Sequence, residues 1–348
     1  MLRRATADIL SLMSGTMRAV VLTGPGECSV REVPVPEATP GEVVVEVERA
    51  GVCGTDVELF TGELSYLQTG HSSYPLRPGH EWSGRVREVG AGVDPAWLGR
   101  RVTGDTMLGD RTCRRCRRGR QHVCEDRQEV GIRGGRAGAL AERLAVPAWS
   151  VKELPDTVDP VLGALVEPGG NAWRAAHAAE VGAGDRALVI GPGTIGLLTA
   201  MFLRAAGVEV HLLGVTDASL DFARGLGFDA ARTRPALPLD AVVDASTAPG
   251  SPALAVDLVE PGGRVVCIGI AGTPSTVDTR TLLLKDVTAV GVLSGSPGLD
   301  ATIAAYAGGA VDPRPLVAAT VGLEQVGAVL AGERPAGRGP KVHVDPRA

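Results

Sequence analysis

Three short segments carry residue types that can hold a metal ion or move a proton. They are 51–56 (Gly-Val-Cys-Gly-Thr-Asp), 78–81 (Pro-Gly-His-Glu) and 166–168 (Val-Glu-Pro). A buried cysteine is usually a small core hydrophobe and a lone histidine is usually a hydrogen-bonding group, so no single segment assigns a site. Together, thiolate, imidazole and carboxylate are ligands that zinc prefers, and three of them leave a coordination position open for a substrate oxygen.

A second group of chemically active residues is the cysteine cluster Cys113, Cys116 and Cys124, which falls within twelve residues. Such clustering is typical of a metal knuckle rather than a disulfide framework, and it favours a reducing cytoplasm. An arginine-rich run, 111–120, interleaves the cysteines, but no Phe, Tyr or Trp lies between Asp110 and Cys124 to stack on a base. With a net charge of −5, we expect no nucleic-acid partner.

A glycine-rich segment predicts dinucleotide binding. Its residues are Gly191, Pro192, Gly193, Thr194, Ile195 and Gly196, which match G-x-G-x-x-G. The segment lies between an apolar run, 187–190, and a helix-period run, 197–206, which is the context such a loop requires. Gly191 permits the tight turn, Gly193 lets the backbone approach a pyrophosphate, and Gly196 lets the helix pack on the strand. A purely structural glycine turn is the alternative that this context disfavours.

The choice between NAD and NADP depends on the end of the next strand, 208–213. An acidic residue there would hydrogen-bond the ribose of NAD. Gly214 occupies that place, and Asp217 follows three residues later. No arginine lies in 215–222 to pair with the 2′-phosphate of NADP. Both cofactors stay open, with Gly214 and Asp217 as candidate cofactor-binding residues.

The elements that must position these residues divide the chain into two regions. From Met17 to about Val146, short Val-rich runs alternate with Gly and Pro, which predicts an all-β, barrel-like domain. From about Leu165, strands and helices alternate, which predicts a doubly wound parallel sheet and an α/β chain. The expected boundaries are 17–164 with 301–348 for the first domain, 165–300 for the second, and 1–16 for an N-terminal extension.

Length and hydropathy exclude other classes of protein. A chain of 348 residues is long enough for two cores. No apolar run reaches the roughly 18 residues of a membrane span, and residues 1–16 lack the small-residue cleavage site of a secretory signal. We expect a soluble cytoplasmic protein with no membrane partner, and an upstream start codon explains the extension better than a weak transit peptide.

Taken together, these segments resemble the zinc-containing medium-chain dehydrogenase superfamily, which includes alcohol, sorbitol, threonine and glucose dehydrogenases. The resemblance covers nearly the whole chain from Met17 onward. It implies a GroES-like β-barrel catalytic domain and a Rossmann-fold domain that binds NAD or NADP. It also implies hydride transfer between this cofactor and a small-molecule secondary alcohol or ketone, in a homodimer or homotetramer.

The resemblance assigns roles to the first three segments. Cys53, His80 and Glu167 would hold the catalytic zinc, since the polyol branch of the family has Glu-Pro at the third ligand. Glu81 would coordinate directly or exchange with a water. In addition, Asp56 would accept a hydrogen bond from His80 and orient it, and Thr55 would take the proton of the alcohol.

Two features depart from the family pattern. Many relatives have a histidine five residues after the ligand cysteine, where this chain has Glu58, so the proton relay is expected to use Glu58, ribose hydroxyls or water. The family's structural zinc lobe has four cysteines spaced C-x2-C-x2-C-x7-C. This chain has Asp110 at the first position and Cys113, Cys116 and Cys124 at the others. One carboxylate and three thiolates can complete a tetrahedral zinc site, and an empty lobe is the alternative.

The insert 57–77 carries many polar side chains, which suit a sugar, polyol or cyclitol substrate, although a polar surface loop explains them equally well. Two rival functions stay open. One is a zinc-free enone or quinone reductase of the same superfamily, but such relatives lack the Cys, His and Glu set. The other is a non-catalytic dinucleotide-binding protein, against which the presence of Thr55 and Asp56 speaks.

Overall fold

The computed structural model describes residues 15–348, which divide into two compact units. The first unit comprises the described residues up to Glu167 together with 317–337 and 341–348, and the second comprises 168–316 and 338–340. Residues 1–14 of the expected N-terminal extension lie outside the described residues. No helix in the described part of the chain is long and apolar enough to cross a membrane.

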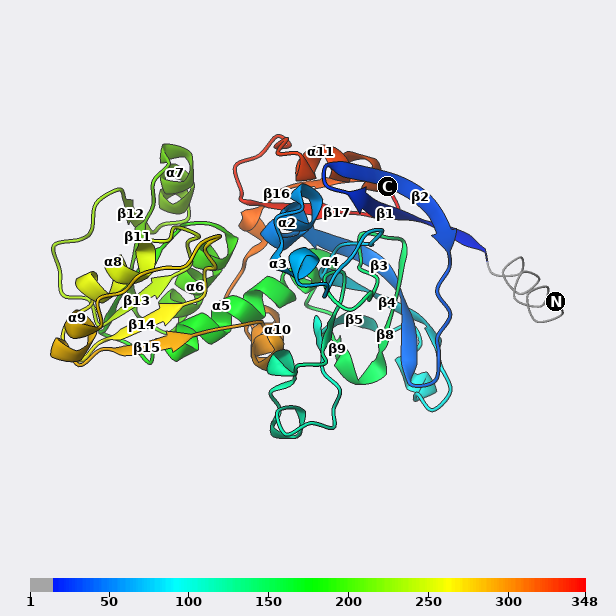
Figure 1. Ribbon diagram of the computed structural model, residues 1–348, viewed down its shortest axis with the longest axis horizontal. Coiled ribbons are helices and arrows are strands. Elements are labelled where there is room, and N and C mark those ends of the chain that lie inside the picture. The colour runs from blue at the N-terminus through cyan, green and yellow to red at the C-terminus, as the bar shows by residue number, and fades with distance from the viewer. Residues whose placement is uncertain (1–14) are drawn as a thin grey trace. The chain divides into compact units, whose positions relative to one another are not determined.

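A seven-stranded sheet forms the first unit, and β3 (Glu42–Val52) is its central strand (Figure 1). On one side β3 pairs antiparallel with β4 (Glu81–Val89). On its other side it pairs with β8 (Arg143–Pro147) along its first residues and with β17 (Lys341–Val344) along its last. Val43, Val44 and Val45 are all buried. Consecutive buried valines show that both faces of β3 are covered, as a closed, barrel-like sheet requires.

The remaining elements of the first unit are short. The strands are β1 (Thr16–Gly24), β2 (Glu27–Pro34), β5 (Arg101–Gly104), β6 (Met107–Leu108), β7 (Gln128–Glu129), β9 (Val151–Glu153) and β16 (Val317–Val321). The helices are α2 (Gly54–Thr61), α3 (Ser65–Gln68), α4 (Pro160–Ala164) and α11 (Val326–Leu330). The predicted β-rich texture is therefore confirmed, and the chain returns to this unit through β16 and β17.

The second unit contains a six-stranded parallel sheet with the order β12, β11, β10, β13, β14, β15 (Figure 1). Its strands are β10 (Arg186–Ile190), β11 (Glu209–Leu213), β12 (Asp229–Ala231), β13 (Ala241–Asp244), β14 (Arg264–Cys267) and β15 (Thr288–Gly291). Its helices are α6 (Thr194–Ala205), α7 (Asp217–Gly225), α8 (Ser251–Leu258), α9 (Thr279–Leu284) and α10 (Leu299–Ala307). The strand order reverses between β10 and β13, which is the switch point where ligands bind in such sheets.

Helix α5 (Val166–Ala178) links the two units along the chain and was not predicted. Its segment contains Pro168, Gly169 and Gly170, which lower helix propensity and favoured a short join. Tertiary packing overrides that propensity, because a Cβ on Gly169 would lie 2.2 Å from the hydroxyl of Tyr306 in α10.

Residues 301–316 cluster with the second unit, whereas the sequence placed them with the first domain. The physical reason lies in α10. The ring of Tyr306 stacks on that of Phe202 in α6, with centroids 6.2 Å apart. The return to the first unit begins only at Val317.

Candidate active site and metal centres

The structure brings Cys53, His80 and Glu81 together in the first unit. Cys53 caps the N-terminus of α2 directly after β3, and His80 and Glu81 lie at the start of β4. Since Gly51 is the strand partner of Glu81, the pairing of β3 with β4 carries the two segments to the same place. One potential ligand atom from each residue lies within 4.8 Å of the others. His80 and Glu81 are buried and Cys53 is half-buried.

The carboxylate of Asp56 ties both segments in place. The backbone amide of Cys53 donates to its Oδ2 over 2.9 Å, and the amide of Gly79 donates to its Oδ1 over 3.0 Å. Asp56 is fully buried. His80 Nδ1 lies 3.6 Å from Oδ1, which is longer than a hydrogen bond. Asp56 therefore positions the backbones that carry Cys53 and His80, and it faces His80 as a charge rather than as the expected hydrogen-bond acceptor.

The charges around His80 favour its protonated form. Burial lowers its pKa, but the negative charges of Asp56 and Cys53 outweigh burial and raise the pKa well above its usual value. A metal ligand must be neutral imidazole. A zinc ion at this site would therefore compete with a proton for His80.

Lys341 is a residue of this site that sequence reasoning missed. Its Nζ contacts both carboxylate oxygens of Glu81, at 2.7 and 2.8 Å, and donates to the carbonyl of Val52 over 3.0 Å. Both side chains are almost fully buried. Burial lowers the pKa of Lys341, but Glu81 and then Cys53 more than offset it and raise the pKa. A Cβ on Gly51 would lie 2.1 Å from Glu81 Oε2, so only glycine leaves room for this pair.

The other expected residues occupy different positions. Glu167 is buried in the first turn of α5, and it does not belong to the group that Cys53, His80 and Glu81 form. Thr55 is half-buried in α2, and Glu58 is exposed one turn later. Partial desolvation and, next, the charge of Glu63 raise the pKa of Glu58.

The polar insert 57–77 uses much of its polarity internally. The hydroxyl of Tyr66 donates to Glu129 over 3.0 Å, and Arg127 donates to the same hydroxyl over 2.8 Å. The hydroxyls of Ser72 and Tyr74 donate to backbone carbonyls. These side chains anchor the insert on its own unit, so they give less support to a hydroxyl-rich substrate than the sequence suggested.

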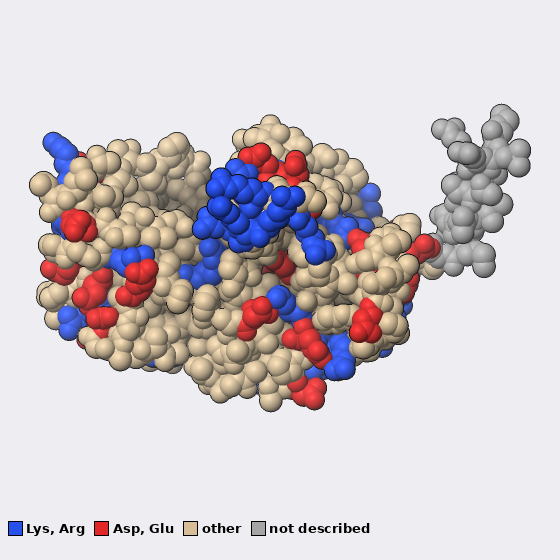
Figure 2. Space-filling view, turned by 90° about the horizontal axis from the view of Figure 1, so that it is seen from below, with Lys and Arg blue, Asp and Glu red and all other residues tan. Residues whose placement is uncertain are grey.

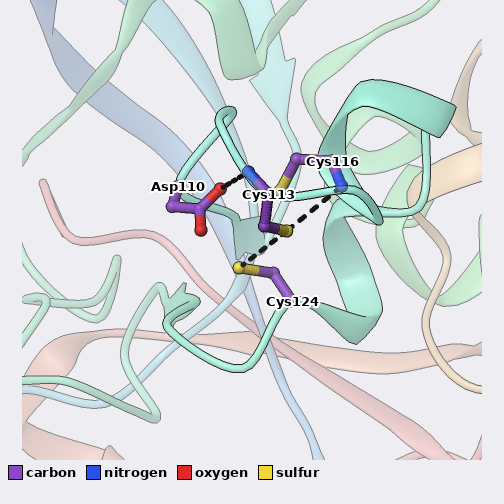
Figure 3. Close-up of side chains that lie close together, drawn as sticks. All are labelled: Asp110, Cys113, Cys116 and Cys124. Atoms are coloured by element: carbon purple, nitrogen blue, oxygen red, sulfur yellow. Dashed lines mark hydrogen bonds between the residues drawn. The ribbon is translucent and has the colours of Figure 1, made fainter.

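The second metal-ligating group contains all four expected residues, Asp110, Cys113, Cys116 and Cys124, with ligand atoms within 4.8 Å of one another. Figure 3 shows the four side chains pointing toward one another. The amides of Thr112 and Cys113 donate to Asp110 Oδ1 over 2.7 and 2.9 Å. The sulfurs of Cys113 and Cys124 are 3.8 Å apart. Two ligands about 2.3 Å from one ion at the tetrahedral angle lie about 3.8 Å apart, so the spacing fits zinc.

Backbone amides and burial set the protonation of this group in the absence of metal. The amides of Cys113 and then Thr112 lower the pKa of Asp110. The amide of Cys116 lowers the pKa of Cys113. In contrast, desolvation raises the pKa of Cys116 to about 12. This environment favours the thiol form of Cys116, whereas a metal ligand must be the thiolate.

The predicted dinucleotide loop joins β10 to α6 in the second unit. Gly191 has a φ of 95°, which favours glycine. A Cβ on Gly196 would lie 1.9 Å from the carbonyl oxygen of Gly191, so the first turn of α6 packs directly on the loop. Helix α6 begins at Thr194 with Gly193 as its N-cap. Its N-terminal amides therefore lie at the switch point, where a pyrophosphate binds.

Arg232 lies near the end of β11, and the sequence did not indicate it as a candidate cofactor-binding residue. Its Nη2 lies 2.9 Å from Asp217 Oδ1, and its Nη1 donates to the carbonyl of Val215. Arg232 directly follows β12, a three-residue strand too short to stand out in the sequence. Gly214 allows no acidic side chain at this strand end, since its Cβ would lie 2.7 Å from Pro192.

Comparisons with known proteins agree with this geometry. Residues 39–156 match the family model of the alcohol dehydrogenase GroES-like domain, and residues 194–307 match that of zinc-binding dehydrogenase. An L-threonine 3-dehydrogenase from Sinorhizobium fredii is 29% identical over 90% of this chain and 94% of its own length. Another, from Mesorhizobium japonicum, is 32% identical over 78% of this chain and 82% of its own length.

Solved structures show the same architecture. A candidate zinc-binding dehydrogenase from Sinorhizobium meliloti 1021, bound to NADP, has a TM-score of 0.87 at 29% identity, and the match covers 95% of this chain and 100% of that one. The alcohol dehydrogenase of Thermus sp. ATN1 has a TM-score of 0.86 at 27% identity over 94% and 99% of the two chains. The chain therefore belongs to the zinc-dependent medium-chain dehydrogenase superfamily, as an NAD(P)-dependent enzyme of the alcohol dehydrogenase type with a GroES-like and a Rossmann-like domain.

Proposed function

We propose that the chain oxidises a secondary alcohol, or reduces the matching ketone, with a catalytic zinc held by Cys53, His80 and Glu167. The observation that carries the proposal is the arrangement around Asp56, which holds the backbones of Cys53 and Gly79 and so brings a thiol and an imidazole together. If Cys53 and His80 served only to stabilise the fold, no buried ion pair of Glu81 and Lys341 would be needed beside them.

Cys53 and His80 suit zinc as ligands, and Glu167 is the third ligand by the family resemblance, since it lies outside the group of close ligand atoms. His80 Nδ1 is buried without a hydrogen-bond partner and faces Asp56, which leaves the other ring nitrogen for a metal. A thiolate and a carboxylate neutralise a divalent cation. The charge of Glu81 is already balanced by Lys341, so Glu81 remains off the metal. When bound, zinc supplies a Lewis acid that lowers the pKa of an alcohol.

Proton transfer falls to Thr55 and Glu58. They are three residues apart on α2 and therefore share a face of that helix. Thr55 accepts the proton of the substrate hydroxyl and passes its own toward Glu58. The raised pKa of Glu58 suits a group that takes up a proton and releases it to water.

We assign Asp110, Cys113, Cys116 and Cys124 to a second, structural zinc. The sulfur spacing of 3.8 Å supports this assignment. Asp110 uses Oδ1 for the two backbone amides, which leaves Oδ2 for the ion. A reduced, metal-bound cysteine lobe is stable in a cytosol, where we place the protein.

For the cofactor we propose a preference for NADP. The loop 191–196 holds the pyrophosphate at the start of α6. At the ribose end, Gly214 excludes the carboxylate that selects NAD, and Arg232 offers a guanidinium that a 2′-phosphate would share with Asp217 and the carbonyl of Val215. The hydroxyls of Thr216 and Ser219 lie 2.7 Å apart at the N-terminus of α7, where they bond to each other and would have to turn outward to reach a phosphate. A 2′-phosphate pairs with such groups. The Sinorhizobium meliloti relative with NADP bound is consistent with this preference.

The substrate class follows from chemistry shared among relatives. Threonine, in the name of the curated relatives, carries its hydroxyl on a secondary carbon. A structure of galactitol-1-phosphate dehydrogenase is 25% identical to this chain, and its name denotes a polyol phosphate. We therefore propose a secondary alcohol with neighbouring polar groups, such as a polyol, sugar, cyclitol or hydroxy acid. Homodimers or homotetramers are the proposed assembly.

The test is a substrate panel of these compounds with NADP and NAD separately, read by absorbance of the reduced cofactor, alongside zinc analysis. We expect turnover of a secondary alcohol by the zinc-loaded enzyme and a lower Kd for NADPH than for NADH, measured by fluorescence titration. Arg232→Gln should narrow the difference in Kd, whereas Arg280→Gln, an exposed arginine paired within its own turn, should not. Activity unaffected by complete zinc removal contradicts the proposal and favours the zinc-free reductase.

A further inference from the structure

The surface of the cysteine lobe, residues 109–125, carries a dense group of arginines that the proposed function does not use. Its members are Arg111, Arg114, Arg115, Arg117, Arg118 and Arg120. Figure 2 shows one large cluster of basic side chains on the face in view. The chain as a whole has a net charge of −5, so this concentration of positive charge is a local feature.

Most of these arginines have no carboxylate partner. Arg115 pairs with Glu125 over 2.7 Å, and Arg111 lies 5.4 Å from the ring centre of Trp149. Among the described residues no ion pair involves any of the remaining four: Arg114, Arg117, Arg118 and Arg120. Elsewhere an exposed arginine commonly has such a partner, as Arg100 does in Glu153 at 2.8 Å.

The proposed zinc does not balance this charge. Three thiolates and one carboxylate around a divalent cation leave a net charge of about −2. The six positive charges of the arginines exceed the sum of that charge and the charge of Glu125. The lobe therefore stays positive with its metal bound, and part of its basic surface needs another counter-charge.

The arginines surround a hollow rather than a flat surface. A cavity of about 410 Å³ is lined by Cys113, Arg114, Arg115, Arg118 and Arg120. The chain turns back on itself at Gly119, which has a φ of 70°, and so directs residues on both sides of the turn toward one space. A cavity of this volume is in the range of small-molecule sites.

We propose that this cavity binds a small anion with two or more linked phosphoryl groups, as in pyrophosphate or a nucleoside diphosphate. Guanidinium groups match phosphate oxygens in a bidentate geometry, which an ammonium group does not. Phosphoryl groups carry about −1.5 to −2 each at neutral pH, so two of them balance the three unpaired arginines that line the cavity, Arg114, Arg118 and Arg120. The concave shape favours a small anion over a nucleic acid, and no Phe, Tyr or Trp lies between 110 and 124 to stack on a base.

The test is calorimetric titration of the zinc-loaded protein, without dinucleotide, with inorganic pyrophosphate in about 150 mM salt. Three proteins are compared: wild type, the triple variant Arg114→Gln, Arg118→Gln, Arg120→Gln, and the control Arg100→Gln, Arg280→Gln, Arg314→Gln. The control removes the same charge from exposed arginines outside the cavity. We expect the cavity variant to bind at least about tenfold more weakly and the control to bind as wild type.

Further arms make the outcome decisive. A triple Arg→Lys variant at positions 114, 118 and 120 keeps the charge, and we expect intermediate affinity because the bidentate geometry is lost. ADP binding as tightly as pyrophosphate assigns recognition to the phosphoryl groups alone, and tighter ADP binding adds a nucleoside contact. Zinc per chain is measured before and after, since polyphosphates chelate metals. Three results would overturn the proposal. The control variant binds pyrophosphate as weakly as the cavity variant, the heat of titration tracks the loss of zinc, or a short RNA binds more tightly than pyrophosphate.

Discussion

The two metal-ligating groups of the first unit are built in opposite ways. The group of Cys53, His80 and Glu81 is assembled by strands that are distant in sequence, is mostly buried, and has one lysine as its counter-charge. The group of Asp110 and three cysteines comes from fifteen consecutive residues and is mostly half-buried. A buried charge depends on its one partner, whereas a charge near water is screened. Single changes in the first site should therefore cost more stability and activity than single changes in the second.

The largest expected effect is that of Lys341→Met. The variant leaves Glu81 buried without its partner, which costs about 3–5 kcal/mol of unfolding free energy. Urea denaturation measures the loss. The double variant Lys341→Met, Glu81→Gln removes both charges and should recover most of it. A single variant as stable as wild type contradicts the view that this pair is the site's internal counter-charge.

Acid should destabilise the same region through His343. This side chain is fully buried in β17 with neither ring nitrogen hydrogen-bonded, and burial, then Lys341 and Arg49, lower its pKa to about 3. The unfolded chain, with a histidine pKa near 6.5, binds an extra proton between these two values. Stability from this group is therefore complete above about pH 6.5 and falls by up to about 1.4 kcal/mol per pH unit below it.

Comparing urea denaturation of wild type and His343→Gln at pH 7 and pH 5 isolates this contribution. The variant should lose less stability on acidification than wild type does. Equal losses of stability in both proteins would show that burial does not keep His343 neutral in the folded state.

Asp56→Asn tests how the buried site is positioned. An amide can accept a hydrogen bond at one atom only, so one of the two backbone amides loses its partner and the negative charge facing His80 disappears. We expect zinc affinity or kcat to fall about 10- to 100-fold. The fold should survive, as judged by circular dichroism. Unchanged zinc affinity and kcat would mean that Asp56 only stabilises the loops.

Cys116→Ser should have the smallest effect on catalysis. Since Cys116 lies in the lobe, the variant should lose one zinc per chain and a few degrees of Tm, while kcat per remaining zinc stays within about twofold of wild type. Elemental analysis with initial-rate assays measures both. A loss of kcat as large as that of Asp56→Asn would remove the distinction between the two sites.

The two sites also differ in how far the sequence predicts them, because one is assembled from distant strands and the other from consecutive residues. The cysteine lobe and the G-x-G-x-x-G loop are local, so the family's cysteine spacing placed Asp110 with the three cysteines and the glycine pattern located α6. Lys341 lies 260 residues from Glu81 along the chain, and no local pattern links the two. Their contact requires the pairing of β17 with β3 and of β3 with β4.

Other features were missed for a related reason. Arg232 reaches Asp217 only through the parallel pairing of β12 with β11, and β12 is too short to show a period. Helix α5 contains Pro168 and two glycines, which lower the helix propensity of this segment. Packing against α10 imposes a helix there despite that propensity. The polar insert left two interpretations open because composition does not show which hydroxyls are already bonded within the protein.

The most direct test of the buried site as the catalytic centre is zinc per chain and activity in wild type, Cys53→Ser and Cys116→Ser. We expect two zinc ions in wild type and one in each variant, with dehydrogenase activity abolished only in Cys53→Ser. A wild-type enzyme that is active without zinc, or a Cys53→Ser enzyme that retains full activity, would contradict the assignment of the buried site as the catalytic centre.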